Sequence, residues 1–209
     1  MVSVSDNAAY RDGAAPSRAW TWRGPRYIAE VFDGPDDALA ALESVQRGLK
    51  CTGFQSLNWL TVLYEELAPS KRAMPRVVIV TERNSGEVAI VLPLLVTKKR
   101  TLRIGRMADL GVSDYGGPIL GLAPLKKRRS IRRVWRAIRH ALKDVDLIKL
   151  ERMPAEIGGL PNPLVAPSGA TPARHSGNVL TIETTVEDFL RSRGKKYRKE
   201  VERCIRLWE

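Results

Sequence analysis

Cysteine and histidine are scarce in this chain of 209 residues, which contains only Cys51, Cys204, His140 and His175. Two cysteines cannot build a disulfide framework, and residues this few and this far apart do not form a four-ligand zinc motif. Each cysteine is best explained as a small apolar residue in a reducing compartment. A catalytic cysteine–histidine pair has no local sequence support. We therefore predict neither a metal site nor a disulfide framework.

Long apolar runs are also missing. The longest run, Ala89 to Val96, has eight residues and contains Pro93, whereas a helix needs about 20 apolar residues to span a bilayer. The N-terminal segment mixes Asp6, Arg11 and Asp12 with small residues and lacks the apolar core of a signal peptide. These absences predict a cytoplasmic protein without a transmembrane segment.

Positive charge, in contrast, is abundant and concentrated. The net charge is +12, and the stretch from Lys98 to Lys143 holds fourteen basic residues against two acidic ones. A second basic run extends from Arg191 to Arg206. Hydrophobic residues make up 44% of the chain and charged residues 28%, which is typical of a globular domain and argues against wholesale disorder.

Local patterns predict strands and helices in a definite order. Strands are expected at residues 27–32, 76–81, 88–96, 101–110, 147–150 and 179–182, where apolar and β-branched residues cluster. The turn Asn84-Ser85-Gly86-Glu87 predicts a hairpin between the second and third of these. Helices are expected from Pro35 to Leu49, Thr52 to Ala68, Leu125 to Lys143 and residues 184 to 209, each with an apolar stripe at helical spacing.

Three segments follow from this pattern. Residues 1–24 are small and polar without a period, and we interpret them as a flexible tail. Residues 25–183 hold the expected strands and helices and form one lobe. The helix of residues 184–209 begins at a possible capping box, Thr184-Thr185-Val186-Glu187. Its apolar stripe reaches Trp208 without a capping residue, which suggests that it leads to a missing second lobe.

Four short motifs occur in a characteristic order along residues 26 to 209. They are Thr52-Gly53-Phe54-Gln55-Ser56-Leu57-Asn58-Trp59-Leu60, Val91-Leu92-Pro93-Leu94, Ser113-Asp114-Tyr115-Gly116-Gly117-Pro118, and Asp188-Phe189-Leu190 with Lys195-Lys196-Tyr197-Arg198-Lys199. Together with the element order, they resemble the GNAT superfamily of acyltransferases. Within it, the chain is similar to the two-domain FemAB-like group that includes the CelD acetyltransferases of cellulose biosynthesis.

The resemblance implies an α+β fold, with a mixed, largely antiparallel central sheet flanked by helices. It also implies an acyl or aminoacyl transferase that uses acetyl-CoA or another acyl-CoA, of which this chain is the N-terminal lobe. Single-domain GNAT enzymes often hold the donor's pyrophosphate on Arg/Gln-x-x-Gly-x-Gly/Ala, at a helix start. Residues 191–196 and 83–88 each match half of that motif, so the donor site is not identified.

Acyl transfer needs groups that orient an acceptor, move its proton and stabilise the developing oxyanion. Asp114 and Tyr115, in the loop after the strand meander, are candidate catalytic residues: the carboxylate could orient the acceptor and the phenol could donate a proton. The alternative is that Asp114 caps a turn and Tyr115 packs on the sheet. Gln55, Asn58 and Trp59 could line an acceptor pocket, although Gln55 also suits a capping box, Thr52-Gly53-Phe54-Gln55, and Trp59 a core position.

The basic helix of residues 125–143 has three interpretations. It could be the solvated outer face of a helix packed on the core, a surface for nucleic acid or acidic lipid, or an attractant for an anionic donor such as CoA. The chain lacks an RRM-type strand motif and a zinc module, so nucleic acid is not expected. We therefore predict an acyl-CoA-dependent transferase with a saccharide, amine or other small acceptor; the alternative is a basic binding protein without catalysis.

Overall fold

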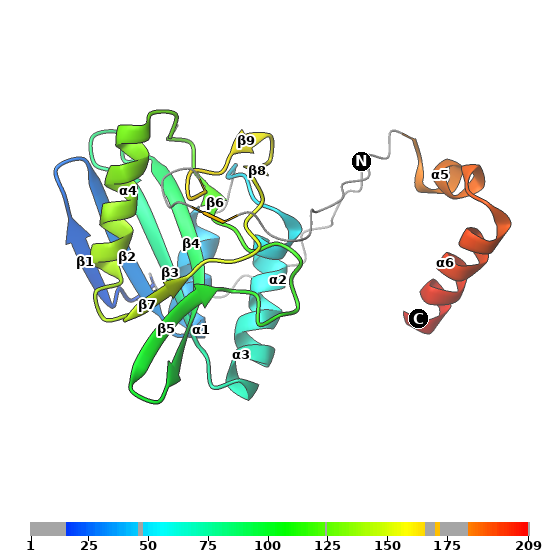
Figure 1. The fold of residues 1–209 in the computed structure, drawn as a ribbon, viewed down its shortest axis with the longest axis horizontal. Coiled ribbons are helices and arrows are strands. Elements are labelled where there is room, and N and C mark those ends of the chain that lie inside the picture. The colour runs from blue at the N-terminus through cyan, green and yellow to red at the C-terminus, as the bar shows by residue number, and fades with distance from the viewer. Residues whose placement is uncertain (1–15, 46–47, 124, 166–169, 172–183, 209) are drawn as a thin grey trace. The chain divides into compact units, whose positions relative to one another are not determined.

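The chain divides into two compact units, Met1–Pro172 and Ala173–Glu209. The computed structural model describes residues 16–45, 48–123, 125–165, 170–171 and 184–208. The first unit holds a mixed, mostly antiparallel sheet flanked by helices, and the second holds two helices (Figure 1). The predicted α+β fold class is therefore confirmed. The division falls eleven residues before the predicted lobe boundary at residue 183.

Seven strands form the main sheet. They are β1 (Trp20–Arg23), β2 (Tyr27–Asp33), β3 (Met74–Glu82), β4 (Val88–Lys99), β5 (Leu102–Met107), β6 (Ile119–Leu120) and β7 (Leu147–Lys149). The order across the sheet is β1-β2-β3-β4-β5-β7, and β6 pairs with β4 beside the end of β5. All described pairings in this sheet are antiparallel except that of β5 with β7. A separate hairpin contains β8 (Glu156–Ile157) and β9 (Leu160–Pro161).

Helices cover both faces of the sheet. In the first unit they are α1 (Pro35–Val45), η1 (Gly53–Gln55), α2 (Leu57–Val62), η2 (Leu63–Leu67), α3 (Ala68–Ser70) and α4 (Arg128–Ala141). Figure 1 shows α4 across one face and α2 and α3 along the other. The core is accordingly split into two clusters, one containing the buried side chains of α4 and the other those of α1 to α3.

The strand residues alternate between these clusters with the period of two that a pleated strand imposes. In β3, Val78 and Val80 belong to the α4 cluster, whereas Val77 and Ile79 belong to the α1–α3 cluster. Since both faces of the central strands are covered, their sequences are continuously apolar instead of alternating with polar residues. This explains the apolar run of residues 89–96.

Pro93 lies where β4 exchanges one partner for another. The first part of β4 pairs with β6 through Ile90 and Val91, and the later part pairs with β5 from Leu94 onward. The Pro93 carbonyl accepts a hydrogen bond from the Ala108 amide, 3.1 Å away. Because the N–H and C=O of an antiparallel residue point to the same edge, the donor that proline lacks would face the loop of residues 108–118. Proline is therefore tolerated inside this central strand.

The N-terminal tail prediction requires a correction. Residues 20–23, which the sequence placed in a flexible tail, form β1 and pair with residues 28–31 of β2. The Trp20 indole also donates a hydrogen bond to the Ala141 carbonyl at 2.7 Å. A four-residue edge strand is too short to show a periodic pattern, and its pairing and helix contact depend on distant residues. The strand expected at residues 179–182 lies outside the described residues.

The second unit contains α5 (Val186–Ser192) and α6 (Lys195–Trp208). Sequence predicted one helix here, and the structure divides it at Arg193 and Gly194. The N-cap is Thr185, whose hydroxyl accepts a hydrogen bond from the Asp188 amide at 3.1 Å, one residue later than the predicted capping box. The Gly194 carbonyl accepts the first bond of α6, from the Arg198 amide.

Candidate functional site

The carboxyl ends of β5 and β7 define the edge of the sheet where a site is expected. Ile104 of β5 pairs in parallel with Leu147 of β7, so both strands end on the same side. In open α/β sheets, ligands bind outside the carboxyl ends of parallel strands. Here the two outgoing loops are residues 108–118 after β5 and residues 150–155 after β7. The first of these carries Asp114 and Tyr115.

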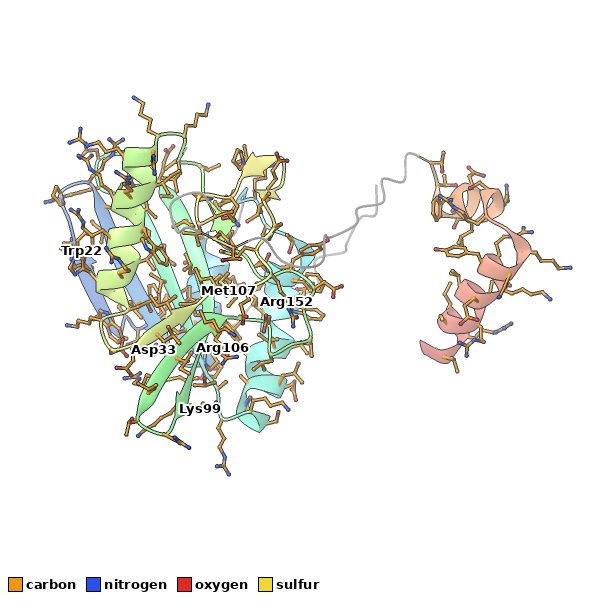
Figure 2. All side chains as sticks on the ribbon, in the orientation of Figure 1. Trp22, Asp33, Lys99, Arg106, Met107 and Arg152 are labelled. Atoms are coloured by element: carbon orange, nitrogen blue, oxygen red, sulfur yellow. The ribbon has the colours of Figure 1, made fainter. Side chains whose placement is uncertain are left out.

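The two loops are bonded to each other. Nη1 of Arg152 donates to the Ser113 carbonyl at 2.8 Å, and the Gly116 amide donates to the Arg152 carbonyl at 3.1 Å. A Cβ atom on Gly116 would lie 2.8 Å from the Glu151 carbonyl oxygen and 3.2 Å from Cβ of Met107. Only glycine therefore allows this close approach. Figure 2 shows Met107 and Arg152 at this edge of the sheet.

Gln55, before α2, joins the same loop from the other side. Its side chain is buried, with 2% exposed. Its Nε2 donates to the Tyr115 carbonyl at 3.1 Å, while its Oε1 accepts from the Thr52 amide at 3.3 Å and the Thr52 hydroxyl at 2.7 Å. A buried amide satisfied at both ends holds its neighbours in place. The Gln55 side chain thus accepts the bond from the Thr52 amide that the predicted capping box requires. It also holds in place the loop that carries the catalytic candidates Asp114 and Tyr115.

Aromatic side chains line the junction between α2 and the loop. The Trp59 indole donates to the Ser113 hydroxyl at 3.2 Å. The ring of Phe54 meets that of Trp59 edge-on, with centroids 5.3 Å apart, and lies 6.3 Å from the ring of Tyr115. The structure therefore brings Gln55, Trp59 and Tyr115 together, three of the five residues that the sequence singled out.

The other two, Asp114 and Asn58, are exposed. Among the described residues, neither side chain has a hydrogen-bond or ion-pair partner, and the Tyr115 phenol has none either. Asp114 lies between the two anchored residues Ser113 and Tyr115, and Asn58 directly precedes the anchored Trp59. Their backbones are consequently held in place while their polar groups remain available to a ligand.

Sequence reasoning missed Ser113, Arg152 and Phe54 as parts of the site. Ser113 was recognised only as part of a loop motif, and Arg152 is a single basic residue in an irregular connection. Arg152 has φ of 53°, a left-handed conformation that is strained for a residue with a side chain and is more frequent at functional sites. Its guanidinium has five N–H donors, and the Ser113 carbonyl engages Nη1 alone.

The two segments that match half of the pyrophosphate-binding motif, residues 83–88 and 191–196, lie in different structural elements. Residues 83–87 form the turn between β3 and β4, and Val88 begins β4, so this match lies in a hairpin, as expected, and no helix begins there. Gly194 directly precedes α6, whose first turn contains Lys195 and Lys196 and no acidic residue. A helix start with basic residues is compatible with a phosphate group, and the hairpin turn of the first match offers no helix start.

The described residues contain no group of three or more histidine, cysteine, aspartate or glutamate side chains placed to hold a metal ion. None of their helices combines the length and apolar character needed to cross a membrane. Comparison of the chain with protein-family models, curated proteins and solved structures finds no match.

Proposed function

We propose that this chain is a GNAT-like acyltransferase lobe that uses an acyl-CoA donor. The observation that supports this most is that the loop of Asp114 and Tyr115 is bonded to the loop of Arg152 where the parallel strands β5 and β7 end. The element order also agrees with the order on which the resemblance rests: β2, α1, α2, then the meander β3-β4-β5, then α4 and β7. An acyl-CoA, when bound, supplies an activated acyl group with a thiolate leaving group.

Each residue of the junction has its own role in the proposed acyl transfer. The Asp114 carboxylate orients the acceptor amine or hydroxyl and takes its proton. The Tyr115 Oη holds the proton that the departing sulfur requires. The unengaged donors of Arg152 stabilise negative charge on the reacting carbonyl oxygen, and Phe54 and Trp59 shield the site from water.

Gln55, Trp59 and Asn58 have different parts in this proposal. Gln55 and Trp59 hold residues 113–115 through hydrogen bonds to the Tyr115 carbonyl and the Ser113 hydroxyl. Asn58 has an unengaged amide and binds the acceptor. The resemblance suggests a saccharide or amine acceptor in the cytoplasm, and a second GNAT-like lobe as partner.

Donor binding is tested by thermal unfolding of the whole chain with and without acetyl-CoA. A ligand at 100 times its Kd stabilises the folded state by about 2.7 kcal/mol. For a chain of this size we expect Tm to rise by roughly 5–10 °C. Desulfo-CoA and ATP serve as controls for the thioester and for the nucleotide. No rise in Tm with saturating acetyl-CoA would overturn the proposed donor.

Catalysis is tested by measuring thiol release from acetyl-CoA with a panel of amines, sugars and alcohols. Asp114→Asn keeps the shape of the side chain but cannot accept the acceptor's proton, so we expect kcat to fall about 10²-fold or more. Glu43→Gln is the matched control, since Glu43 is an exposed residue of α1, and it should leave kcat unchanged. Equal turnover by the Asp114→Asn variant and the wild type would remove Asp114 from the mechanism.

A further inference from the structure

The outer face of α4 and the residues at its two ends carry many basic side chains. Residues 126–143 include nine lysines and arginines and no acidic residue. Eight of the nine are exposed, and we call them the α4 basic row: Lys126, Lys127, Arg128, Arg129, Arg132, Arg136, Arg139 and Lys143. The junction at the ends of β5 and β7 uses none of them.

The basic side chains of this row are not paired with carboxylates. Among the described residues, no member of the α4 basic row forms an ion pair. Some basic residues elsewhere on the first unit do, such as Arg18 with Glu30 at 2.9 Å and Lys149 with Glu151 at 2.8 Å. A solvated protein surface usually intersperses charges of both signs, whereas residues 126–143 contain charges of one sign only.

The positive charges of the α4 basic row also destabilise α4 itself. Arg128, Arg132 and Arg136 follow at four-residue steps, and each like-charged pair at this spacing costs about 0.2–0.5 kcal/mol. The first turn of α4 contains arginines and no acidic residue, although the helix dipole favours negative charge there. Buried residues such as Val134 and Ile138 hold α4 on the sheet. Core packing therefore explains the helix but not the single sign of its outer face.

The length of α4 suits a ligand that presents several phosphates in a row. At 1.5 Å per residue, a 14-residue helix is about 21 Å long, and a nucleic-acid strand presents one phosphate per roughly 3.4 Å of its axis. Arginine, which dominates the row, binds phosphate oxygens through two parallel N–H groups. The exposed face of α4 can therefore contact several successive phosphates.

A bilayer fits the same face less well. Helices that lie in a membrane surface insert an apolar face among the lipids. The apolar face of α4 is already buried against the sheet, and within the described chain none of the exposed large apolar side chains belongs to α4. His140, at the end of the helix, stacks on Trp22 of β1 with centroids 5.2 Å apart and planes 4° apart, which fixes this end of the row before a ligand arrives.

From these observations we infer that the α4 basic row binds the phosphate backbone of a nucleic-acid strand without reading its sequence. Neither an RRM-type motif nor a zinc module is required, because contacts to phosphates alone provide non-specific affinity. This surface is separate from the proposed acyl-transfer site, and it stands whether or not the chain transfers acyl groups.

The test is fluorescence anisotropy of the full chain with labelled 20-nucleotide DNA and RNA strands between 50 and 200 mM KCl. If the row neutralises about five phosphates, log K should fall with log[salt] with a slope of about −3.5 for single strands. The variant Arg132→Gln, Arg136→Gln, Arg139→Gln keeps good helix formers on α4. It should reduce the slope by about 2 and weaken binding at 100 mM KCl at least tenfold.

A matched control removes the same charge elsewhere. Lys71→Gln, Arg83→Gln, Lys99→Gln changes three exposed basic residues outside α4; Figure 2 shows Lys99 at the tip of the β4–β5 hairpin, away from α4. This variant should bind within about twofold of the wild type, and far-UV circular dichroism checks the fold of both variants.

Four results would overturn the inference. They are the absence of binding at 50 mM KCl, equal loss of binding in both triple variants, displacement of the strand by stoichiometric acetyl-CoA, and binding to phosphatidylserine vesicles without binding to either strand. The Asp114→Asn variant should bind nucleic acid like the wild type. Failure of the acyl-transfer proposal is thus distinguishable from failure of this one.

Discussion

Tyr64 of η2 is buried in the α1–α3 cluster, and its phenol donates a hydrogen bond to the Leu94 carbonyl at 3.3 Å. Burial raises the pKa of the Tyr64 phenol far above its ordinary value of about 10. The folded chain therefore keeps this proton at a pH where the unfolded chain has lost it.

This raised pKa predicts a loss of stability in alkali. Below pH 10 the phenol is neutral in both states, so its contribution is fully present. Above pH 10 the unfolded chain binds fewer protons, and Tyr64 lowers the free energy of unfolding by up to about 1.4 kcal/mol per pH unit. Urea unfolding at pH 9 and pH 11 measures the difference.

Tyr64→Phe isolates this contribution from that of other titrating groups. The variant loses one hydrogen bond, worth about 1 kcal/mol at neutral pH, and it should lose less stability than the wild type between pH 9 and pH 11. The same pH dependence in both proteins would show that the Tyr64 phenol ionises without unfolding.

At the scale of elements, the junction at the ends of β5 and β7 depends on how closely the two loops approach. Gly116→Ala would place a methyl group 2.8 Å from the Glu151 carbonyl oxygen, closer than real Cβ atoms come, so the loops must separate. We expect a loss of about 1–3 kcal/mol, typical of overpacking, together with faster hydrogen exchange at the Gly116 amide. Urea unfolding and exchange mass spectrometry measure the two effects.

Gly53→Ala is the control for this prediction. A Cβ atom on Gly53 meets nothing within 4 Å, so the free energy of unfolding should change by less than about 0.5 kcal/mol. If Gly116→Ala were equally harmless, the contact between residues 116 and 151 would be looser than the structure shows.

Local elements could be predicted from the sequence because their signals are local. The amphipathic spacing from Ile131 to Leu142 predicted α4, and the turn at residues 84–87 predicted the β3–β4 hairpin. The helix start at Thr52 was recognised from Thr52 and Gln55, three residues apart. In each case a few neighbouring residues determine the backbone conformation.

The partners within the site could not be predicted in the same way. Gln55 bonds to Tyr115 across 60 residues, and Arg152 bonds to Ser113 across 39. Gln55, Trp59 and Tyr115 were each noticed for their side-chain chemistry and local setting, but nothing in the sequence showed that they would meet. The parallel pairing of β5 with β7 brings the loops together, and that pairing has no local signal.

At the scale of the whole molecule, the buried hydrophobic side chains among the described residues all belong to the first unit. Within the described chain, they extend from Tyr27 to Leu164. The apolar residues Tyr197 and Ile205 of α6 are about half exposed, at 49% and 51%. Helices of this length are marginal in water when isolated. Among the described residues, burial of apolar side chains therefore stabilises the first unit.

Arg76 links several elements of that unit. Its side chain is fully buried, and it donates to Asp33 of β2 at 2.8 Å and to Asp144, after α4, at 2.8 Å. Its guanidinium carbon also lies 4.7 Å from the ring centroid of Trp20 in β1. Asp144 in turn pairs with Arg103 of β5. Burial alone would lower the pKa of Arg76, but these bonds outweigh burial and the pKa is raised.

Removal of Arg76 should destabilise the first unit as a whole. Arg76→Met keeps much of the side-chain volume but leaves Asp33 and Asp144 without their shared partner, and breaking a buried pair on one side costs about 3–5 kcal/mol. Both carboxylates retain 24% exposure, so we expect the lower end of this range. Arg103→Met, at a side chain with 40% exposure, should cost at most about 1 kcal/mol. Equal urea midpoints for the two variants would contradict a central role for Arg76, whereas a larger loss in Arg76→Met with one cooperative transition would show that this arginine unites the sheet and α4.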